Sequence, residues 1–196
     1  MGAAASRSQC VLVGADSLLI ECAQVMLDRG HHVVAIVAGS PRVAAWAAAR
    51  GLLTLAVDDA HSWVDQLAGQ DIDYLFAITH LRVLPAAALA LPHVMAINFH
   101  DGPLPQFAGL NTPVWGLLHG EAEWGVTWHQ LTETVDAGDI LVQRRFALAT
   151  RETSLSLNTS NVAHALDSFD ELLDLLEAGT LVGRPQDPAA EHGVYR

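Results

Sequence analysis

The sequence predicts an α/β fold in which helices cover a mainly parallel, twisted sheet. Two patterns carry this prediction. Short apolar segments typical of buried strands alternate along the chain with helical segments. Three of the helical segments stop just before a glycine, the residue that commonly terminates a helix. Strands and helices that alternate with short connections imply a parallel sheet with right-handed crossovers. The chain has 196 residues, 51% of them hydrophobic, which is enough for one sizeable core.

The first hundred residues account for the parallel part of the sheet. We expect strands over residues 10–15, 32–38, 53–57, 73–79 and 94–100. We expect helices over 17–28, 41–50 and 60–68, with a short turn around 85–90.

The second half of the chain predicts a helix, a strand pair and a long helix. The first helix covers 112–119 and is closed by Gly120, and the strands cover 125–131 and 140–143. The long helix covers 155–178, with apolar residues at helical spacing and acidic residues largely on its other faces. We expect one domain over 1–182, and the tail 183–196 has the composition of a linker or a truncated small subdomain.

Two polar residues close the last of the first five strands. Asn98 and His100 are two residues apart, so on a strand both side chains project from the same face. Gly102, Pro103 and Pro105 follow and force a loop. The pair therefore lies at the carboxyl edge of the sheet, where open α/β folds bind ligands. The alternative interpretation is that Asn98 caps the strand and His100 is a satisfied core histidine.

A carboxylate lies at the tip of the later strand pair. The loop 132–139 joins the strand beginning at Gly125 to the strand beginning at Ile140, and it carries Asp136. A loop carboxylate by itself is usually just solvated.

Together, these segments resemble the catalytic domain of the folate-dependent formyltransferases. That family has Asn-x-His, a Leu-Pro-containing loop and glycine, then a distant Val/Leu-Asp-x-Gly. The corresponding residues here are Asn98-Phe99-His100, Pro103-Leu104-Pro105, Gly109 and Val135-Asp136-Ala137-Gly138. The likeness covers residues 10–195 and implies a Rossmann-like fold, with 1–182 as the catalytic domain. One stretch departs from the family, because Gly102-Pro103-Leu104-Pro105 stands where its members usually have Ser-Leu-Leu-Pro.

The resemblance implies that Asn98, His100 and Asp136 are catalytic. Formyl transfer from N10 of 10-formyltetrahydrofolate to an amine passes through a tetrahedral intermediate that carries an oxyanion. Asn98 and a cationic His100 would donate hydrogen bonds to that oxygen. Asp136 would help to move the proton from the attacking amine to the departing N10.

The resemblance also implies how the folate co-substrate is held. The pterin would lie against Leu81, Arg82, Val83 and Leu84, and against Thr134 and Val135 in the Asp136 loop. The alternative for the three apolar residues of the first segment is ordinary core packing, and both interpretations can hold at once. Arg82 needs a partner, for which a glutamate carboxylate of the folate is a candidate.

Four residues after the catalytic histidine are candidates for substrate binding: Gln106, Phe107, Asn111 and Trp115. The forms His-Asp-Gly-Pro-Leu-Pro and Ala-Gly-Leu-Asn most resemble the formylation domains of nonribosomal peptide synthetases. Those domains formylate an aminoacyl group on a carrier protein, so we expect a carrier protein or adenylation/carrier modules as partners.

Other functions remain open at this point. They are hydrolysis of the folate donor, and formylation of a free small amine, an amino sugar nucleotide or glycinamide ribonucleotide. Ala15 and Asp16 argue against a phosphorylated substrate, because Asp16 would place a carboxylate where a phosphate cradle is needed. Of these, hydrolysis is less favoured than transfer, because the chain starts directly at its first strand, whereas dedicated hydrolases usually carry an extra N-terminal domain. A non-catalytic folate- or partner-binding domain is the alternative of another class.

The charge of the chain bears on nucleic acid as a substrate. The formal net charge is −12, from 22 acidic residues and 10 arginines without any lysine. Binding a nucleic acid requires clustered basic residues, and the sequence offers only Arg144-Arg145. The β-rich C-terminal domain of tRNA-formylating relatives would follow this chain and is not in it. We therefore expect no nucleic-acid partner.

Several other classes of site are not indicated. Cys10 and Cys22 make neither a disulfide framework nor a metal site, and we expect both to be small buried hydrophobic residues. The histidines lack metal-ligand spacing, so we expect no metal. No apolar run approaches the ~20 residues of a membrane span, and there is no secretory signal pattern. We expect a cytoplasmic protein without a membrane partner.

Overall fold

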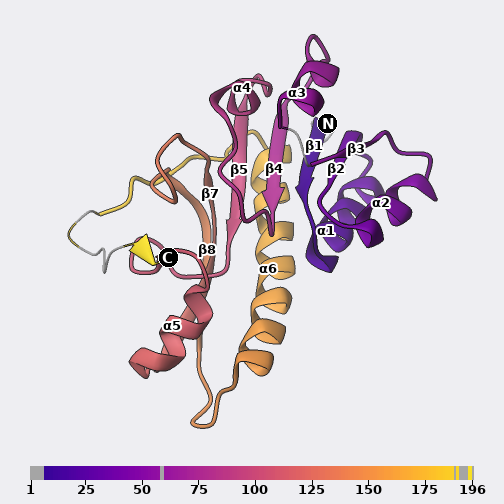
Figure 1. The fold of residues 1–196 in the computed structure, drawn as a ribbon. Helices are drawn as coiled ribbons and strands as arrows, with labels where there is room; N and C mark the ends of the chain where they lie inside the picture. The colour runs from indigo at the N-terminus through magenta and orange to yellow at the C-terminus, as the bar shows by residue number, and fades with distance from the viewer. Residues whose placement is uncertain (1–6, 58–59, 188, 190–193, 196) are drawn as a thin grey trace, which may run out of the picture.

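A seven-stranded mixed sheet forms the centre of the structure, with helices on both of its faces (Figure 1). This computed structural model describes residues 7–57, 60–187, 189 and 194–195. The strand order is β3-β2-β1-β4-β5-β7-β8. The strands are β1 (Gln9–Gly14), β2 (His32–Ala38), β3 (Thr54–Ala56), β4 (Tyr74–Ile78), β5 (Met95–His100), β7 (Glu123–Gln130) and β8 (Ile140–Ala147).

The sheet has a parallel part and an antiparallel edge. The first five strands pair in parallel, as the alternation of strands and helices predicts, and the mainly parallel α/β fold is confirmed. Strand β7 then pairs antiparallel with β5 and β8 pairs antiparallel with β7. Because β7 returns directly beside β5, residues far apart in sequence become cross-strand neighbours at the site.

In the part of the chain that the structure describes, helices lie on both faces of the sheet. Their bounds are α1 (Ser17–Asp28), α2 (Pro41–Ala48), α3 (Ala60–Leu67), α4 (Ala86–Leu89), α5 (Thr112–His119) and α6 (Ser154–Glu177). Helices α1, α2 and α6 pack on one face against a core that includes Leu12, Phe76 and Trp128. Helices α3 and α4 cover the other face, where Val11 and Val13 point. Because side chains alternate along β1, its residues pack into two separate hydrophobic cores, one on each face of the sheet.

Side-chain caps mark the start of two of these helices. Ser40 precedes α2, and its hydroxyl accepts the backbone N–H of Val43. Thr153 precedes α6 and forms a reciprocal capping box with Ser156. Both interactions satisfy amide groups that have no partner within the helix, and they fix the start of each helix.

Some elements differ from their predicted extents. Strand β8 continues through Arg144 and Arg145 to Ala147, because it pairs with β7 along its whole length. Helix α6 begins and ends one residue before the predicted limits. A second, two-stranded sheet, which the sequence does not predict, joins β6 (Ala108–Gly109) to β9 (Val194–Tyr195).

The tail after residue 182 is partly described. Arg184 exchanges two backbone hydrogen bonds with Ile140, each 2.8 Å long. Of the segment predicted to be a linker or a truncated subdomain, residues 188, 190–193 and 196 lie outside the described part of the chain.

Cys10 and Cys22 are free thiols, both fully buried, as predicted. Burial raises the pKa of both thiols well above the ordinary range, so neither is a reactive thiolate. Within the described residues, no helix has both the length and the apolar character needed to cross a membrane.

Candidate active site

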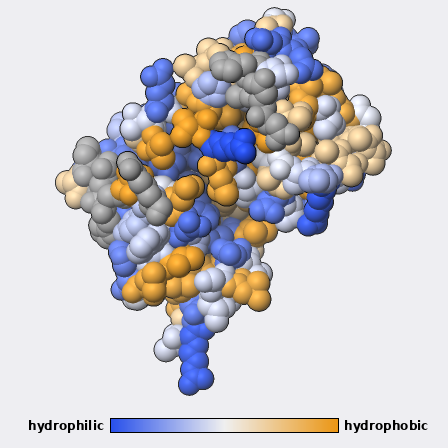
Figure 2. All heavy atoms as spheres, in the orientation of Figure 1, coloured by the Kyte–Doolittle hydropathy of each residue, from blue (hydrophilic) through white to orange (hydrophobic). Residues whose placement is uncertain are grey.

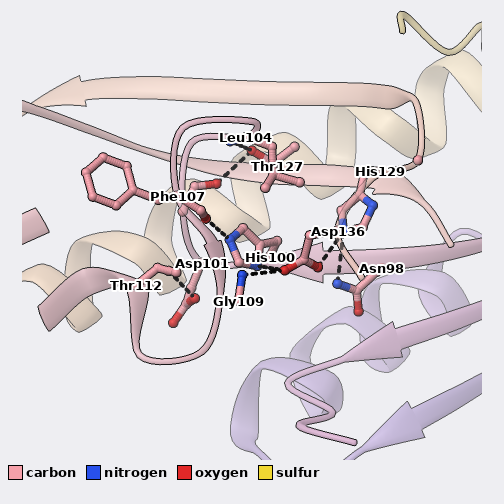
Figure 3. A network of polar contacts seen from close by, with 12 residues as sticks. Asn98, His100, Asp101, Leu104, Phe107, Gly109, Thr112, Thr127, His129 and Asp136 are labelled. Atoms are coloured by element: carbon pink, nitrogen blue, oxygen red, sulfur yellow. Dashed lines mark hydrogen bonds and ion pairs between the residues drawn. The ribbon is translucent and has the colours of Figure 1, made fainter. Parts of the chain in front are cut away.

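The carboxyl end of β5 brings together the two polar residues predicted to share a face. Asn98 lies directly opposite His129 of β7, and His100 lies opposite Thr127. The Nδ2 atom of Asn98 is 3.1 Å from Nε2 of His129. Cross-strand pairing therefore places a second histidine beside the predicted pair (Figure 3).

His100 is 5% exposed, and each of its ring nitrogens faces a protein oxygen. The Nε2 atom donates to the backbone carbonyl of Phe107 at 2.6 Å, and Nδ1 lies 3.6 Å from Oδ2 of Asp136. The cationic form can donate to both oxygens. Donation from Nε2 to a substrate would require the contact with the Phe107 carbonyl to open.

Asp136 reaches this histidine from the loop between β7 and β8. Its backbone is in the left-handed region, at φ 52°, which L side chains rarely adopt. This conformation directs the carboxylate toward the carboxyl edge of the sheet, where its Oδ2 accepts the backbone N–H of Gly109 at 2.8 Å. Its Oδ1 lies 3.5 Å from Nε2 of His129 (Figure 3).

The electrostatics of this pocket keep the carboxylate ionised. Burial alone would raise the pKa of Asp136, but contact with His129, the charge of His100 and the Gly109 amide outweigh it. The net effect lowers the pKa of Asp136 to about 2. The site therefore holds a fixed negative charge between two imidazole rings at neutral pH.

His129 is the member of the site that the sequence analysis does not predict. It is 1% exposed, and its Nδ1 donates to the backbone carbonyl of Gln130 at 3.0 Å. In the neutral ring Nε2 is therefore an acceptor, and it takes an N–H of Asn98. Only the cationic ring carries a proton on Nε2 that it can donate to Oδ1 of Asp136. The alternation along β7 places Thr127 and His129 on one face of the strand. The sequence does not show that this face lies at the site, because that follows from the pairing of β7 with β5.

The predicted folate segment lies just beyond the carboxyl end of β4, the neighbour of β5. Leu81 and Val83 are 79% and 73% exposed, so the core-packing interpretation does not describe them, whereas Leu84 is buried in the core. Arg82 is exposed and makes no hydrogen bond or ion pair with the described residues. Thr134 and Val135 are exposed in the Asp136 loop. Figure 2 shows that hydrophobic side chains gather in several places on the face of the molecule drawn there.

The four predicted substrate residues have different environments. Phe107 has a buried side chain in an aromatic cluster with Trp124 and Tyr195, so its backbone carbonyl is what faces the site. The side-chain oxygen of Gln106 accepts from Arg145 at 2.7 Å. Asn111 is exposed just before α5, and Trp115 stacks on Tyr195. Their roles toward a substrate stay predictions.

A metal site is not formed in the part of the chain that the structure describes. No group of three or more His, Cys, Asp or Glu side chains there is arranged to hold an ion. The chemistry available from these residues is hydrogen bonding, charge stabilisation and proton transfer.

The fold and this set of residues define an α/β domain with a polar site at the carboxyl edge of its sheet, of the formyl transferase type. The family model described as "Formyl transferase" matches residues 27–166. The chain therefore belongs to the formyl transferase family.

Individual relatives support this membership. A methionyl-tRNA formyltransferase from Anaeromyxobacter dehalogenans is 36% identical over 178 residues. That match covers 83% of this chain and 57% of the relative, so the chain spans little more than half of that protein.

Solved structures share the fold. Glycinamide ribonucleotide transformylase 1 from Symbiobacterium toebii has a TM-score of 0.82 at 20% identity, covering 92% of this chain and 95% of the other. HypX from Aquifex aeolicus, in complex with tetrahydrofolic acid, has a TM-score of 0.73 at 20% identity, covering 97% and 30%. At these identities the similarity shows the fold alone.

Proposed function

We propose that this protein transfers the formyl group of 10-formyltetrahydrofolate to a primary amine at the site formed by Asn98, His100 and Asp136. The observation that carries the proposal is the convergence of these three side chains, from β5 and from the β7–β8 loop, in a chain that belongs to the formyl transferase family.

The geometry suits the needs of acyl transfer to an amine. One N–H of Asn98 is taken by His129, which leaves its second amide hydrogen for an oxygen that becomes negative during the reaction. Asp136 is ionised and lies 3.6 Å from His100, so the two form a path along which the proton of the attacking amine can leave. Partial burial strengthens these interactions, because water screens them less.

The exposed apolar residues beside the site fit the folate donor. When bound, 10-formyltetrahydrofolate supplies the activated formyl group. Leu81 and Val83 follow β4, whose Ala77 pairs with Asn98, and Val135 directly precedes Asp136. All three are large and exposed, so they offer an apolar surface for a flat ring system. Arg82 offers a positive charge for the carboxylates of the folate. HypX in complex with tetrahydrofolic acid shares this fold.

For the acceptor, we propose the amino group of an amino acid bound to a carrier protein, as in nonribosomal peptide biosynthesis in the cytoplasm. The substrate-side loop is weakly charged, and Asp16 stands at the carboxyl end of β1, where a phosphorylated acceptor would need cations. Three arginines are already committed to acidic partners: Arg29, Arg144 and Arg145. These features favour a protein-tethered acceptor over a nucleic acid.

The direct test is an incubation with 10-formyltetrahydrofolate and a panel of amines that includes an aminoacyl carrier protein, a free amino acid, an amino sugar nucleotide and glycinamide ribonucleotide. We expect tetrahydrofolate release that depends on the aminoacyl carrier protein, with a formylated amine as the product. Release of formate without any amine would mean hydrolysis instead. Binding of the donor without turnover would identify a non-catalytic binding domain.

A further inference from the structure

Gln186, in the tail beyond α6, binds the loop that carries Asp136 through its side-chain amide. Its Nε2 atom donates to the backbone carbonyl of Asp136 and to that of Gly138, each at 2.7 Å. One side-chain amide thus uses both of its N–H groups on two carbonyls of the same turn. The residue lies outside the segment 27–166 that the family model matches.

The turn that Gln186 grips has a backbone that needs external support. Asp136 is a non-glycine residue at positive φ, and such conformations persist only where surrounding contacts hold them. Gly138 packs against the backbone carbonyl of Gln130 so closely that a Cβ atom would overlap it. The two carbonyls that Gln186 binds flank this constrained segment.

The tail itself is anchored firmly enough to act as a support. Just before Gln186, Arg184 pairs with Ile140 through two backbone hydrogen bonds. Further along, Tyr195 of β9 accepts the backbone N–H of Leu110, next to Gly109, whose own N–H holds the Asp136 carboxylate. The tail therefore contacts both loops that meet at Asp136.

We propose that Gln186 is a positioning residue: its amide fixes the Asp136 turn so that the carboxylate stays within reach of His100, His129 and the Gly109 amide. This inference rests on the proposed function where its readout is turnover. It predicts that the tail is an integral part of the site rather than a connector.

The test compares four variants of the full chain. Gln186→Met keeps the length of the side chain but removes both donors, and Gln186→Glu turns a donor into an acceptor that faces two carbonyl oxygens. Gln66→Met is the matched control, because Gln66 also donates to a backbone carbonyl, that of Ser62, but on the surface of α3. Asp136→Asn sets the scale of a lost carboxylate.

We expect Gln186→Met to lower kcat about 10- to 100-fold, since small displacements of reacting groups are costly, with little change in KM for the folate donor. The kcat of Gln186→Glu should be lower still, and the kcat of Gln66→Met should match that of the wild type. If Gln186→Met had the kcat of the wild type while Asp136→Asn lost activity, the positioning role would be overturned and the proposed function would stand.

A second readout does not depend on turnover. The carboxyl group of Asp136 titrates at about pH 2 because His129, His100 and the Gly109 amide face it. Carbon NMR of this carboxyl should show a pKa closer to the ordinary value of 3.8 in Gln186→Met, whereas Gln66→Met should leave it unchanged. An unaltered titration in Gln186→Met would refute the inference, even if no amine is ever formylated.

Discussion

At the scale of single residues, the site is organised around a buried negative charge. Asp136 is stabilised by three groups that come from different parts of the chain: His100, His129 and the Gly109 amide. The same contacts that orient the carboxylate lower its pKa, so its position and its ionisation are linked. This linkage makes the acid stability of the protein a measure of the site.

The acid dependence has a definite sign. The pKa of Asp136 falls from 3.8 to about 2 on folding. Its ionised form therefore stabilises the fold above about pH 4, and this contribution disappears as the pH falls through about 2. We expect the carboxylate to contribute about 2 kcal/mol to the free energy of unfolding at pH 6. Urea unfolding of wild type and Asp136→Asn between pH 6 and pH 2 should show a difference in the free energy of unfolding that shrinks as the pH falls. A difference that stays constant over this range would contradict the prediction.

His129 connects two of the predicted catalytic residues and should affect the rate. His129→Ala leaves Asn98 without its acceptor and Asp136 without one of its imidazole neighbours. We expect kcat for formyl transfer to fall about 10- to 100-fold. The control is His93→Ala, an exposed histidine before β5 whose Nε2 lies 3.3 Å from Oδ1 of Asp71, away from the site. Equal kcat values for the two variants would mean that His129 serves only in packing.

At the scale of elements, the substrate-side loop depends on how α5 packs against β7. Gly116 of α5 lies against the ring of Trp124, and a Cβ atom there would overlap the ring. Trp124 in turn donates from Nε1 to the backbone carbonyl of Asp101, next to His100. A glycine in the middle of a helix is therefore what allows the indole to support the catalytic strand.

This packing predicts a large difference between two substitutions in one helix. Gly116→Ala inserts a methyl group where there is no room, and it should lower the free energy of unfolding by ~1–3 kcal/mol. Leu118→Ala, at a position 70% exposed, should change it by less than about 0.5 kcal/mol. Thermal or urea unfolding checks both. Similar stabilities would show that α5 shifts freely on β7.

At the scale of the whole molecule, local signals predicted the architecture but not the contacts between distant segments. Apolar runs and terminal glycines indicated the five parallel strands and their helices, because those features are local. The i, i+2 spacing placed Asn98 and His100 on one face for the same reason. His129 and Gln186 escaped prediction, because their roles depend on which strand lies beside β5 and where the tail returns. The pairing of β6 with β9 likewise joins residues that are far apart in the chain.

The central claim is that Asn98, His100 and Asp136 together transfer a formyl group. The most direct measurement is tetrahydrofolate release with an aminoacyl carrier protein as acceptor, for wild type and for Asn98→Ala, His100→Ala and Asp136→Ala. We expect each variant to lose at least ~100-fold in turnover, the scale of a lost oxyanion donor or acid–base group, while folate binding survives in the first two. Near-normal turnover in His100→Ala would contradict the account and make His100 a core histidine.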